Sequence, residues 1–170
     1  SMFDPKRLIP KNRETDRWGN LTEEFNKALD MVGYNYLYPR YEIDGQWFPG
    51  RVMAGTETFP FEAYDYWKET ERLPYVIGDF VWTSIDYLGE SGIGKVSFEE
   101  GNAWFGAQFP YHLANCGDID ICGFKRPQSY FRDILWGVRA APYIAVLPPQ
   151  HFGQKARFNQ WGWEPVEESW

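Results

Sequence analysis

The sequence has few of the residues from which metal sites and disulfide frameworks are built. Its 170 residues include two cysteines, Cys116 and Cys122, and two histidines, His112 and His151. Two cysteines alone make neither a disulfide framework nor a metal site, and the histidines lack the spacing of metal ligands. A single disulfide bond between the cysteines stays open, and with it the redox compartment.

Long apolar runs and an excess of positive charge are also missing. No run approaches the roughly 18 apolar residues of a membrane span, and the polar N-terminal segment shows no signal-peptide pattern. The chain has 17 basic and 24 acidic residues, for a net charge of −7, whereas nucleic-acid binding depends on clustered Lys and Arg. We therefore expect no membrane and no nucleic-acid partner, and the localisation, cytoplasmic or periplasmic, stays unknown.

Aromatic residues are the abundant class, with 9 Trp, 11 Tyr and 13 Phe. Such a content suits a large core, a sugar-binding surface, or both, because the C–H faces of sugars lie on aromatic rings while their hydroxyls need carboxylates and amides. A carbohydrate is the ligand class that this composition favours.

The order of the expected elements is typical of an α/β fold. Periodicity and capping signals predict a helix over about residues 20–30, capped by Asn20, strands at 31–36, 52–54 and 75–82, and helices over 61–72 and from Pro127 onward. Residues 37–50 and 88–126 are expected to be long loops. Two steps from buried strand to helix indicate a parallel sheet. A doubly wound nucleotide-binding sheet is disfavoured because the chain has no G-x-G-x-x-G or P-loop motif.

One carboxylate follows a short apolar strand. Val52, Met53 and Ala54 form an apolar run that stops at Gly55, and Glu57 comes two residues later. Catalytic groups of barrel enzymes lie at such carboxyl-terminal strand ends. The alternative, which this stretch alone favours, is an ordinary loop glutamate that caps the following helix.

Four motifs together resemble a known family. Residues 30–36 (DMVGYNY), 55–60 (GTETFP), 78–90 (GDFVWTSIDYLGE) and 117–130 (GDIDICGFKRPQSY) resemble consecutive strand and helix motifs of the catalytic domain of glycoside hydrolase family 2. This is the family of β-galactosidases and β-glucuronidases. The resemblance covers nearly all of residues 20–170, and its order and spacing make it specific.

The resemblance implies a fold and a domain division. The family fold is a TIM (β/α)8 barrel, and this chain is similar to strands six to eight, the C-terminal portion. A complete barrel takes roughly 250 residues, so residues 1–150 are expected to be a partial barrel catalytic domain and residues 151–170 an extended tail or linker toward a following domain. Exposed strand edges would then require self-association or the remainder of the barrel.

The resemblance also implies roles for five residues. Glu57 matches the catalytic nucleophile of a retaining glycosidase, which needs a second carboxyl group about 5 Å away to protonate the leaving oxygen. Tyr36 matches the tyrosine that hydrogen-bonds the nucleophile and helps set its ionisation, and Trp82 matches the tryptophan that lines the sugar subsite. Asn35 and Asp86 are candidates for binding sugar hydroxyls. Packing or a turn is the alternative role for each.

Two family motifs are absent from the sequence. The family's acid/base is the Glu of an Asn-Glu pair, and this chain has no Asn-Glu dipeptide, so we expect little or no glycosidase activity from the chain alone. β-Glucuronidases carry an Asn-x-Lys motif that grips the sugar carboxylate, and it too is missing. The absence favours a neutral sugar, a β-galactoside, and leaves a β-mannoside open. The chemistry requires no cofactor, although the resemblance admits Mg or Na.

Two other function classes stay open. The aromatic content and the missing acid suit a non-catalytic carbohydrate-binding module, and a third reading is a structural fragment with a role in folding or assembly. Covalent labelling by a fluorinated glycoside separates the enzyme from both.

Overall fold

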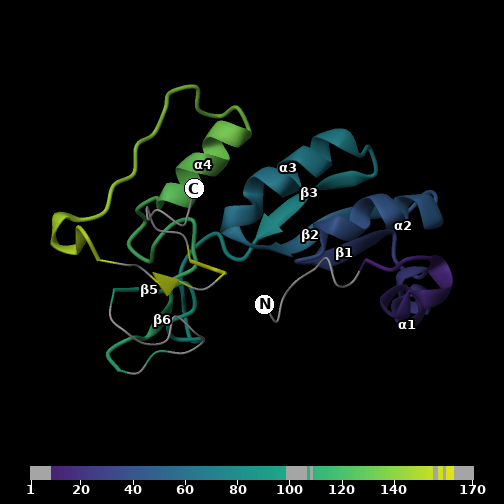
Figure 1. The fold of residues 1–170 in the computed structure, drawn as a ribbon, viewed down its shortest axis with the longest axis horizontal. Coiled ribbons are helices and arrows are strands. Elements are labelled where there is room, and N and C mark those ends of the chain that lie inside the picture. Colours follow the sequence, from purple (N-terminus) through teal and green to yellow (C-terminus); the bar gives the residue numbers. More distant parts are fainter. Residues whose placement is uncertain (1–8, 99–106, 108, 155–156, 159, 163–170) are drawn as a thin grey trace. The chain divides into compact units, whose positions relative to one another are not determined.

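The computed structural model describes residues 9–98, 107, 109–154, 157–158 and 160–162. The chain divides into two compact units, the first of residues 1–58 and 65–80 and the second of residues 59–64 and 81–170. Figure 1 shows the ribbon of both units. Each unit is described by itself below. Among the described residues, no helix is long and apolar enough to cross a membrane.

The first unit contains a three-stranded parallel sheet in the order β1-β2-β3. Its strands are β1 (Met31–Asn35), β2 (Val52–Thr58) and β3 (Val76–Val81). Its helices are α1 (Arg17–Asn26), α2 (Tyr41–Trp47) and α3 (Ala63–Arg72), with 3-10 turns η2 (Arg13–Thr15) and η3 (Tyr38–Arg40). The expected strands are therefore present, and the expected parallel arrangement is confirmed.

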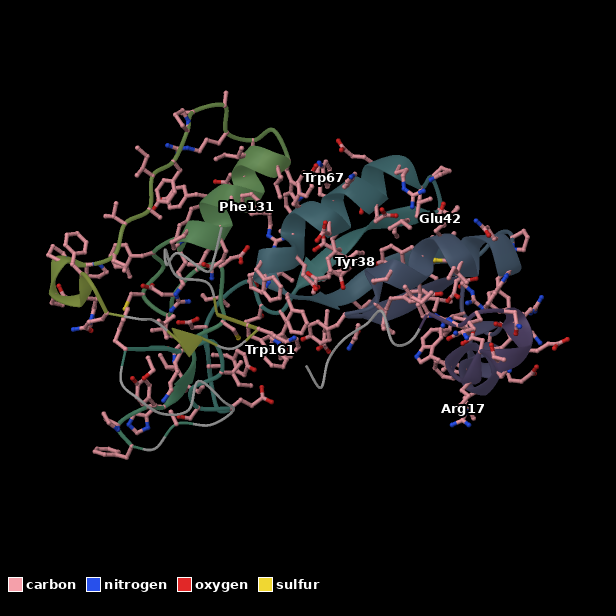
Figure 2. The ribbon with its side chains drawn as sticks, in the orientation of Figure 1. Arg17, Tyr38, Glu42, Trp67, Phe131 and Trp161 are labelled. Atoms are coloured by element: carbon pink, nitrogen blue, oxygen red, sulfur yellow. The ribbon has the colours of Figure 1, made fainter. Side chains whose placement is uncertain are left out.

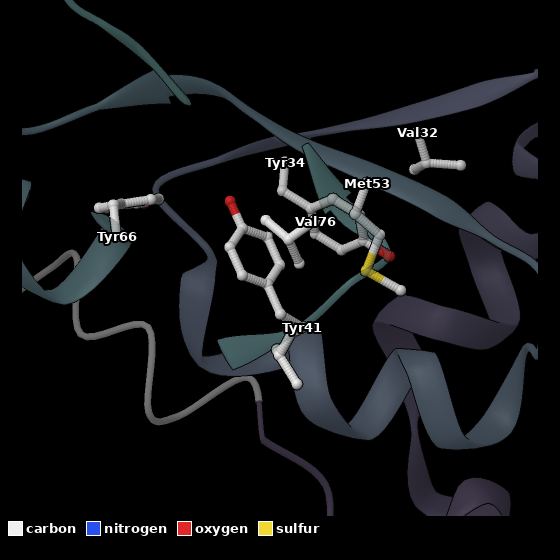
Figure 3. Packing of buried hydrophobic residues seen from close by; sticks show 7 residues of the cluster. Val32, Tyr34, Tyr41, Met53, Tyr66 and Val76 are labelled. Atoms are coloured by element: carbon white, nitrogen blue, oxygen red, sulfur yellow. The ribbon is translucent and has the colours of Figure 1, made fainter. Parts of the chain in front are cut away.

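The core of the first unit lies between one face of the sheet and the helices. Val32 and Tyr34 alternate with exposed residues along β1, so their side chains share one face. On that face they pack with side chains from β2, β3, α2 and α3 (Figure 3); the cluster is Val32, Tyr34, Tyr41, Met53, Tyr66, Leu73 and Val76. The apolar period of two in β1 thus sets which face of the sheet is covered.

A buried ion cluster joins α1 to α2. Arg40, whose side chain is fully buried, donates to both carboxylate oxygens of Asp16, at 3.0 and 2.5 Å, and to Asp44 at 2.7 Å. Asp16 also accepts the N–H of Gly19 at 3.0 Å and is therefore the N-cap of α1. The prediction that Asn20 caps this helix is wrong, because the helix begins one turn earlier.

The second unit contains small antiparallel pairs and one helix. β4 (Tyr87–Leu88) pairs with β6 (Leu113–Ala114), and β5 (Val96–Ser97) pairs with β7 (Arg157–Phe158). The segment also contains η4 (Pro60–Glu62), η5 (Pro149–His151) and α4 (Pro127–Leu135), which begins at the expected proline. The ring of Trp161 (Figure 2) packs edge-on against Phe59 with centroids 5.1 Å apart.

The expectation of a C-terminal TIM-barrel portion, strands six to eight, is wrong for the described residues. Their parallel sheet has three strands, with β1 and β3 at its edges. Each strand of a barrel has a neighbour on both sides, whereas the remaining four strands here pair antiparallel in two separate ribbons. The fold is an open parallel sheet with helices, accompanied by the ribbons of the second unit. The proposed boundary at residue 150 stays a prediction.

Two expected loops contain regular structure. Residues 37–50 were expected to be a loop because of Gly45 and the Pro49-Gly50 pair, yet they form η3 and α2. Position 45 of this helix has no room for a side chain, because a Cβ there would lie 2.2 Å from the ring of Tyr75. Residues 88–126 contribute β4, β5 and β6. In both places, tertiary packing overrides the local signal.

Candidate functional site

The end of β2 contains a β-bulge that changes the direction of its side chains. Tyr34 of β1 is paired with Gly55, but the next residue, Asn35, is paired with Glu57. Thr56 is therefore an extra residue on β2. Such a bulge places two consecutive side chains on one face of a sheet and shifts the alternation that follows by one residue.

The bulge turns Glu57 away from the core. Met53 of β2 belongs to the core cluster, and uninterrupted alternation would send Glu57 to the same face as Met53. Thr56 instead contacts Asn35, which projects from the exposed face of β1, and Glu57 follows on that face. Thr58 returns to the covered face, where it is fully buried.

Two glycines make room for this arrangement. A Cβ at Gly33 would lie 2.6 Å from Oγ1 of Thr56, and a Cβ at Gly55 would lie 2.9 Å from both Cγ2 of Thr58 and Oη of Tyr41. Both distances are shorter than carbon contacts allow, so side chains at these positions would displace the threonines on either side of Glu57.

Tyr36 holds Glu57 through two hydrogen bonds. Its backbone N–H donates to the carbonyl of Glu57 at 2.8 Å, and its Oη donates to Oε2 of Glu57 at 2.9 Å. Tyr36 has a φ of 56°, a left-handed conformation that non-glycine residues seldom adopt and that often marks a functional site. The turn folds the phenol back over the strand end, next to the carboxylate.

The threonines on either side of Glu57 bond to different strands. Thr56 Oγ1 donates to Asn35 Oδ1 on β1 at 2.6 Å, and Thr58 Oγ1 donates to Asp79 Oδ2 on β3 at 2.9 Å. Sequence reasoning assigned no role to these threonines or to Asp79. The Thr-Glu-Thr pattern was visible in the sequence. The register between β1 and β2, which decides what the two threonines contact, was not.

Trp82 of the second unit is held through its indole nitrogen. Nε1 of Trp82 donates to Oη of Tyr87 at 3.2 Å, and the two rings meet edge-on with centroids 5.9 Å apart. The Tyr87 hydroxyl in turn donates to the Glu90 carboxylate. Burial and the hydrogen bond to Glu90 raise the pKa of Tyr87 well above its ordinary value. The partly exposed indole is therefore fixed in orientation and can offer a ring face to a ligand.

Asp86 is almost completely buried, in a bidentate ion pair. Its oxygens accept from Nη1 and Nη2 of Arg126 at 2.6 and 2.7 Å, and Oδ1 also accepts the N–H of Gly117 at 2.9 Å. These contacts tie the segment after β3 to the start of α4. The ion pair supports the alternative role of Asp86, which is packing. Sugar binding by Asp86 stays a prediction.

The structure brings three of the five predicted site residues together. Asn35, Tyr36 and Glu57 lie at the carboxyl ends of β1 and β2 in the first unit. Trp82 and Asp86 belong to the second unit and are described with it. Their roles stay predictions.

The structure was searched for possible metal ligands and free thiols in the part of the chain that it describes. It contains no group of three or more His, Cys, Asp or Glu side chains arranged to hold a metal ion. Cys116 and Cys122 are free thiols, the first buried and the second exposed. Burial raises the pKa of Cys116 to about 12, which keeps this thiol protonated and unreactive.

Comparisons with known proteins point to glycoside hydrolases. No protein-family profile matches the chain. A protein of Formosa agariphila named as a putative beta-glucuronidase is 31% identical over 141 residues, which are 83% of this chain and 10% of that protein. The chain thus spans about a tenth of the length of this relative.

Two solved structures of glycosyl hydrolase family 2 members from Bacteroides cellulosilyticus are also similar. One is 38% identical with a TM-score of 0.64, over 84% of this chain and 18% of that chain. The other, from strain DSM 14838, is 40% identical with a TM-score of 0.53, over 68% of this chain and 13% of that chain. The likenesses support a glycoside hydrolase family 2 fragment, and they cover too little of those chains to show a barrel.

Proposed function

We propose that this chain is the part of a retaining β-glycosidase of family 2 that carries the nucleophile, Glu57. The observation that supports the proposal most is the bulge at Thr56, which turns Glu57 out of the core and beside Tyr36. A retaining enzyme needs a carboxylate that attacks the anomeric carbon and forms a covalent glycosyl intermediate. The similarity to family 2 structures also supports this chemistry.

The hydrogen bonding of Glu57 suits a nucleophile. Of the two carboxylate oxygens of Glu57, Oε2 accepts from the Tyr36 hydroxyl, and no hydrogen bond to Oε1 is found among the described residues. A neutral phenol orients the carboxylate without cancelling its charge, whereas an ion pair would lower its nucleophilicity. Attack would then proceed from Oε1, with Oε2 anchored.

The rest of the longer protein would supply the catalytic acid. The chain has no Asn-Glu pair, which is the family's acid/base motif, and a retaining mechanism requires a second carboxyl group. The chain alone should therefore glycosylate Glu57 only when the leaving group departs without protonation. Unactivated β-glycosides should not be hydrolysed.

A β-galactoside is the substrate that we propose. The chain lacks the Asn-x-Lys motif that grips a glucuronide carboxylate, although one relative carries the name beta-glucuronidase. In this proposal Asn35, which lies in the same unit as Glu57, binds a hydroxyl group of the sugar. The proposed chemistry requires no metal or other cofactor.

Covalent labelling tests this function directly. We would incubate the chain with 2,4-dinitrophenyl 2-deoxy-2-fluoro-β-galactoside and weigh the intact protein. Dinitrophenolate is a weak base and needs no acid catalyst to leave, while the fluorine slows breakdown of the intermediate, so one sugar per chain should accumulate. A simple nitrophenyl β-galactoside should stay intact until the preceding segment of the parent protein is added.

The alternatives give different results in the same assay. Labelling by the fluorinated glucuronide in preference to the galactoside would contradict the proposed sugar. Binding of galactose without labelling would favour a carbohydrate-binding module. The absence of both labelling and binding would contradict the enzyme proposal and favour a structural fragment.

A further inference from the structure

The two residues flanking Glu57 form a pattern that the nucleophile role alone does not explain. Thr56 bonds to β1 through Asn35, at 2.6 Å, and Thr58 bonds to β3 through Asp79, at 2.9 Å. Their hydroxyls extend in opposite directions across the sheet. The residue between them is therefore tied to both neighbouring strands by side chains.

Each threonine occupies a space that its neighbours leave for it. Thr56 lies over Gly33, where a Cβ would approach its Oγ1 to 2.6 Å. Thr58 is fully buried beside Gly55, where a Cβ would approach its Cγ2 to 2.9 Å. Because protein interiors are close-packed, the fitted contacts of the buried Thr58 restrict its rotamers. Thr56 is exposed, and its contacts with Gly33 and Asn35 restrain it instead.

The hydrogen bonds lie where the sheet's own ladder is weakest. A bulge leaves its extra residue unpaired and disrupts the ladder locally, and here the extra residue is Thr56, directly before Glu57. We propose that Thr56 and Thr58 are positioning residues that replace the lost ladder restraint and hold the Glu57 carboxylate in place for attack. The proposal rests on the proposed function of Glu57.

The bond from Thr56 also fixes the amide of Asn35. Asn35 is exposed and pairs with Glu57 across the two strands. Because its Oδ1 accepts from Thr56, its Nδ2 remains as a donor. A donor at this place suits a hydroxyl oxygen of a sugar bound against the nucleophile. Thr56 would thereby contribute to substrate orientation as well as to the position of Glu57.

Paired substitutions separate the hydroxyls from the shapes of the side chains. Thr56→Val and Thr58→Val keep the branched shape and remove the hydroxyl, whereas Thr56→Ser and Thr58→Ser keep the hydroxyl. Thr70→Val is the matched control, because the Thr70 hydroxyl donates to the backbone of Tyr66 within α3. The readout is the rate at which the fluorinated galactoside labels each chain.

The valine variants should be labelled about tenfold more slowly than the wild type, since misplacement of a reacting group by 1 Å can cost 10²-fold. The serine variants should stay within about threefold of the wild-type rate, and Thr70→Val should be unchanged. Equal labelling of the valine variants and the wild type would overturn the positioning role. Thermal melting of each variant identifies any that fails to fold. Thr56→Ala or Thr58→Ala, which also lacks the hydroxyl, then takes the place of the failed valine variant and should likewise be labelled about tenfold more slowly.

A second readout distinguishes failure of the positioning role from failure of the proposed function. Hydrogen exchange of the Tyr36 amide, which donates to the Glu57 carbonyl, should accelerate about tenfold in Thr56→Val and Thr58→Val and not in Thr70→Val. If the wild type takes no label, the function proposal fails, and this exchange then tests the restraint alone. Unchanged exchange in both valine variants would overturn it.

Discussion

Glu57, near the end of β2 in the first unit, and Asp86, after β3 in the second, are both carboxylates, and their surroundings differ. One oxygen of Glu57 accepts from the phenol of Tyr36. Both oxygens of Asp86 are bound by the guanidinium of Arg126, and one also accepts from Gly117. The first carboxylate is bound by a neutral donor at one oxygen, while the charge of the second is balanced by a fixed partner.

The difference shows that the partner of a carboxylate is more informative than its sequence position. A bidentate Arg–carboxylate pair is strong and geometrically specific, and such a pair fixes backbone segments to one another. A neutral hydroxyl donor orients the group and leaves it reactive. Substitution of Glu57 should therefore affect labelling, whereas substitution of Asp86 should affect stability.

The largest expected effect is that of Glu57→Gln on covalent labelling. Because an amide does not attack the anomeric carbon, labelling by the fluorinated galactoside should disappear, with a rate loss of at least about 10³-fold. The free energy of unfolding should change by about 1 kcal/mol or less, because the side chain is not in the core and Gln keeps an acceptor. Intact mass and urea unfolding measure the two quantities.

The matched control for that change is Glu71→Gln, on an exposed residue of α3. It removes a carboxylate from the same unit and should leave labelling unaffected. Residual labelling of Glu57→Gln at the rate of this control would show that another residue is the nucleophile.

Asp86→Asn should lower stability strongly. The change leaves the Arg126 guanidinium without its counter-charge, and breaking a buried pair costs about 3–5 kcal/mol. Because the Arg126 side chain is 20% exposed, we expect about 2–3 kcal/mol from urea unfolding. Asp133→Asn, which breaks the partly exposed pair with Lys125, should cost about 1 kcal/mol or less. Similar losses in both variants would contradict the structural role of Asp86.

Tyr36→Phe should slow labelling about tenfold, because the hydrogen bond that orients Glu57 is lost while the ring remains. Stability should fall by about 1 kcal/mol, the typical net contribution of one hydrogen bond. Tyr38→Phe is the control, since the Tyr38 hydroxyl donates at 3.5 Å to Asp65 and not to Glu57. If the Tyr36→Phe chain is labelled at the wild-type rate, the Tyr36 hydroxyl has no part in the reaction.

The smallest expected effect is the pH dependence of stability that comes from Asp16, a structural carboxylate of the first unit. Burial by itself raises the pKa of Asp16, but hydrogen bonds from Arg40 and from the Gly19 N–H outweigh it and hold the pKa below its ordinary value. A lowered folded-state pKa contributes stability above the unfolded pKa, near 4, which is lost as the pH falls through the folded pKa.

Urea unfolding midpoints measured between neutral pH and the acid range test this contribution. The wild type should lose more stability below about pH 4 than Asp16→Asn, in which this carboxylate is absent. Parallel pH profiles for the two chains would show that the Asp16–Arg40 pair makes no pH-dependent contribution.

Local patterns in the sequence predicted many of the elements. The apolar run at residues 31–36 became β1, and Pro127 marked the start of α4. The prediction of a loop over residues 37–50 was wrong, because the glycine that suggested a loop lies inside α2, where the ring of Tyr75 leaves no room for a Cβ. The prediction of a barrel portion was wrong for a different reason. It rested on the fold of the whole family, whereas the sequence carries only short motifs of that family.

The sequence motifs named three residues that the structure places close together, whereas the geometry that joins them could not be predicted. Glu57, Tyr36 and Asn35 were identified from motifs. They lie together at the carboxyl ends of β1 and β2. The strand was expected to end at Gly55, but β2 continues to Thr58. A bulge leaves no mark in the apolar pattern, because it depends on the register between β1 and β2. The roles of Thr56, Thr58 and Asp79 follow from that register.

Identifying the residue that carries the sugar tests the central claim most directly. The chain labelled with the fluorinated galactoside would be digested and its peptides sequenced by tandem mass spectrometry. We predict a single modified peptide with the sugar on Glu57, in the strand that ends beside Tyr36. A sugar on any other residue, or a chain that takes no label, would contradict the assignment of Glu57 as the nucleophile.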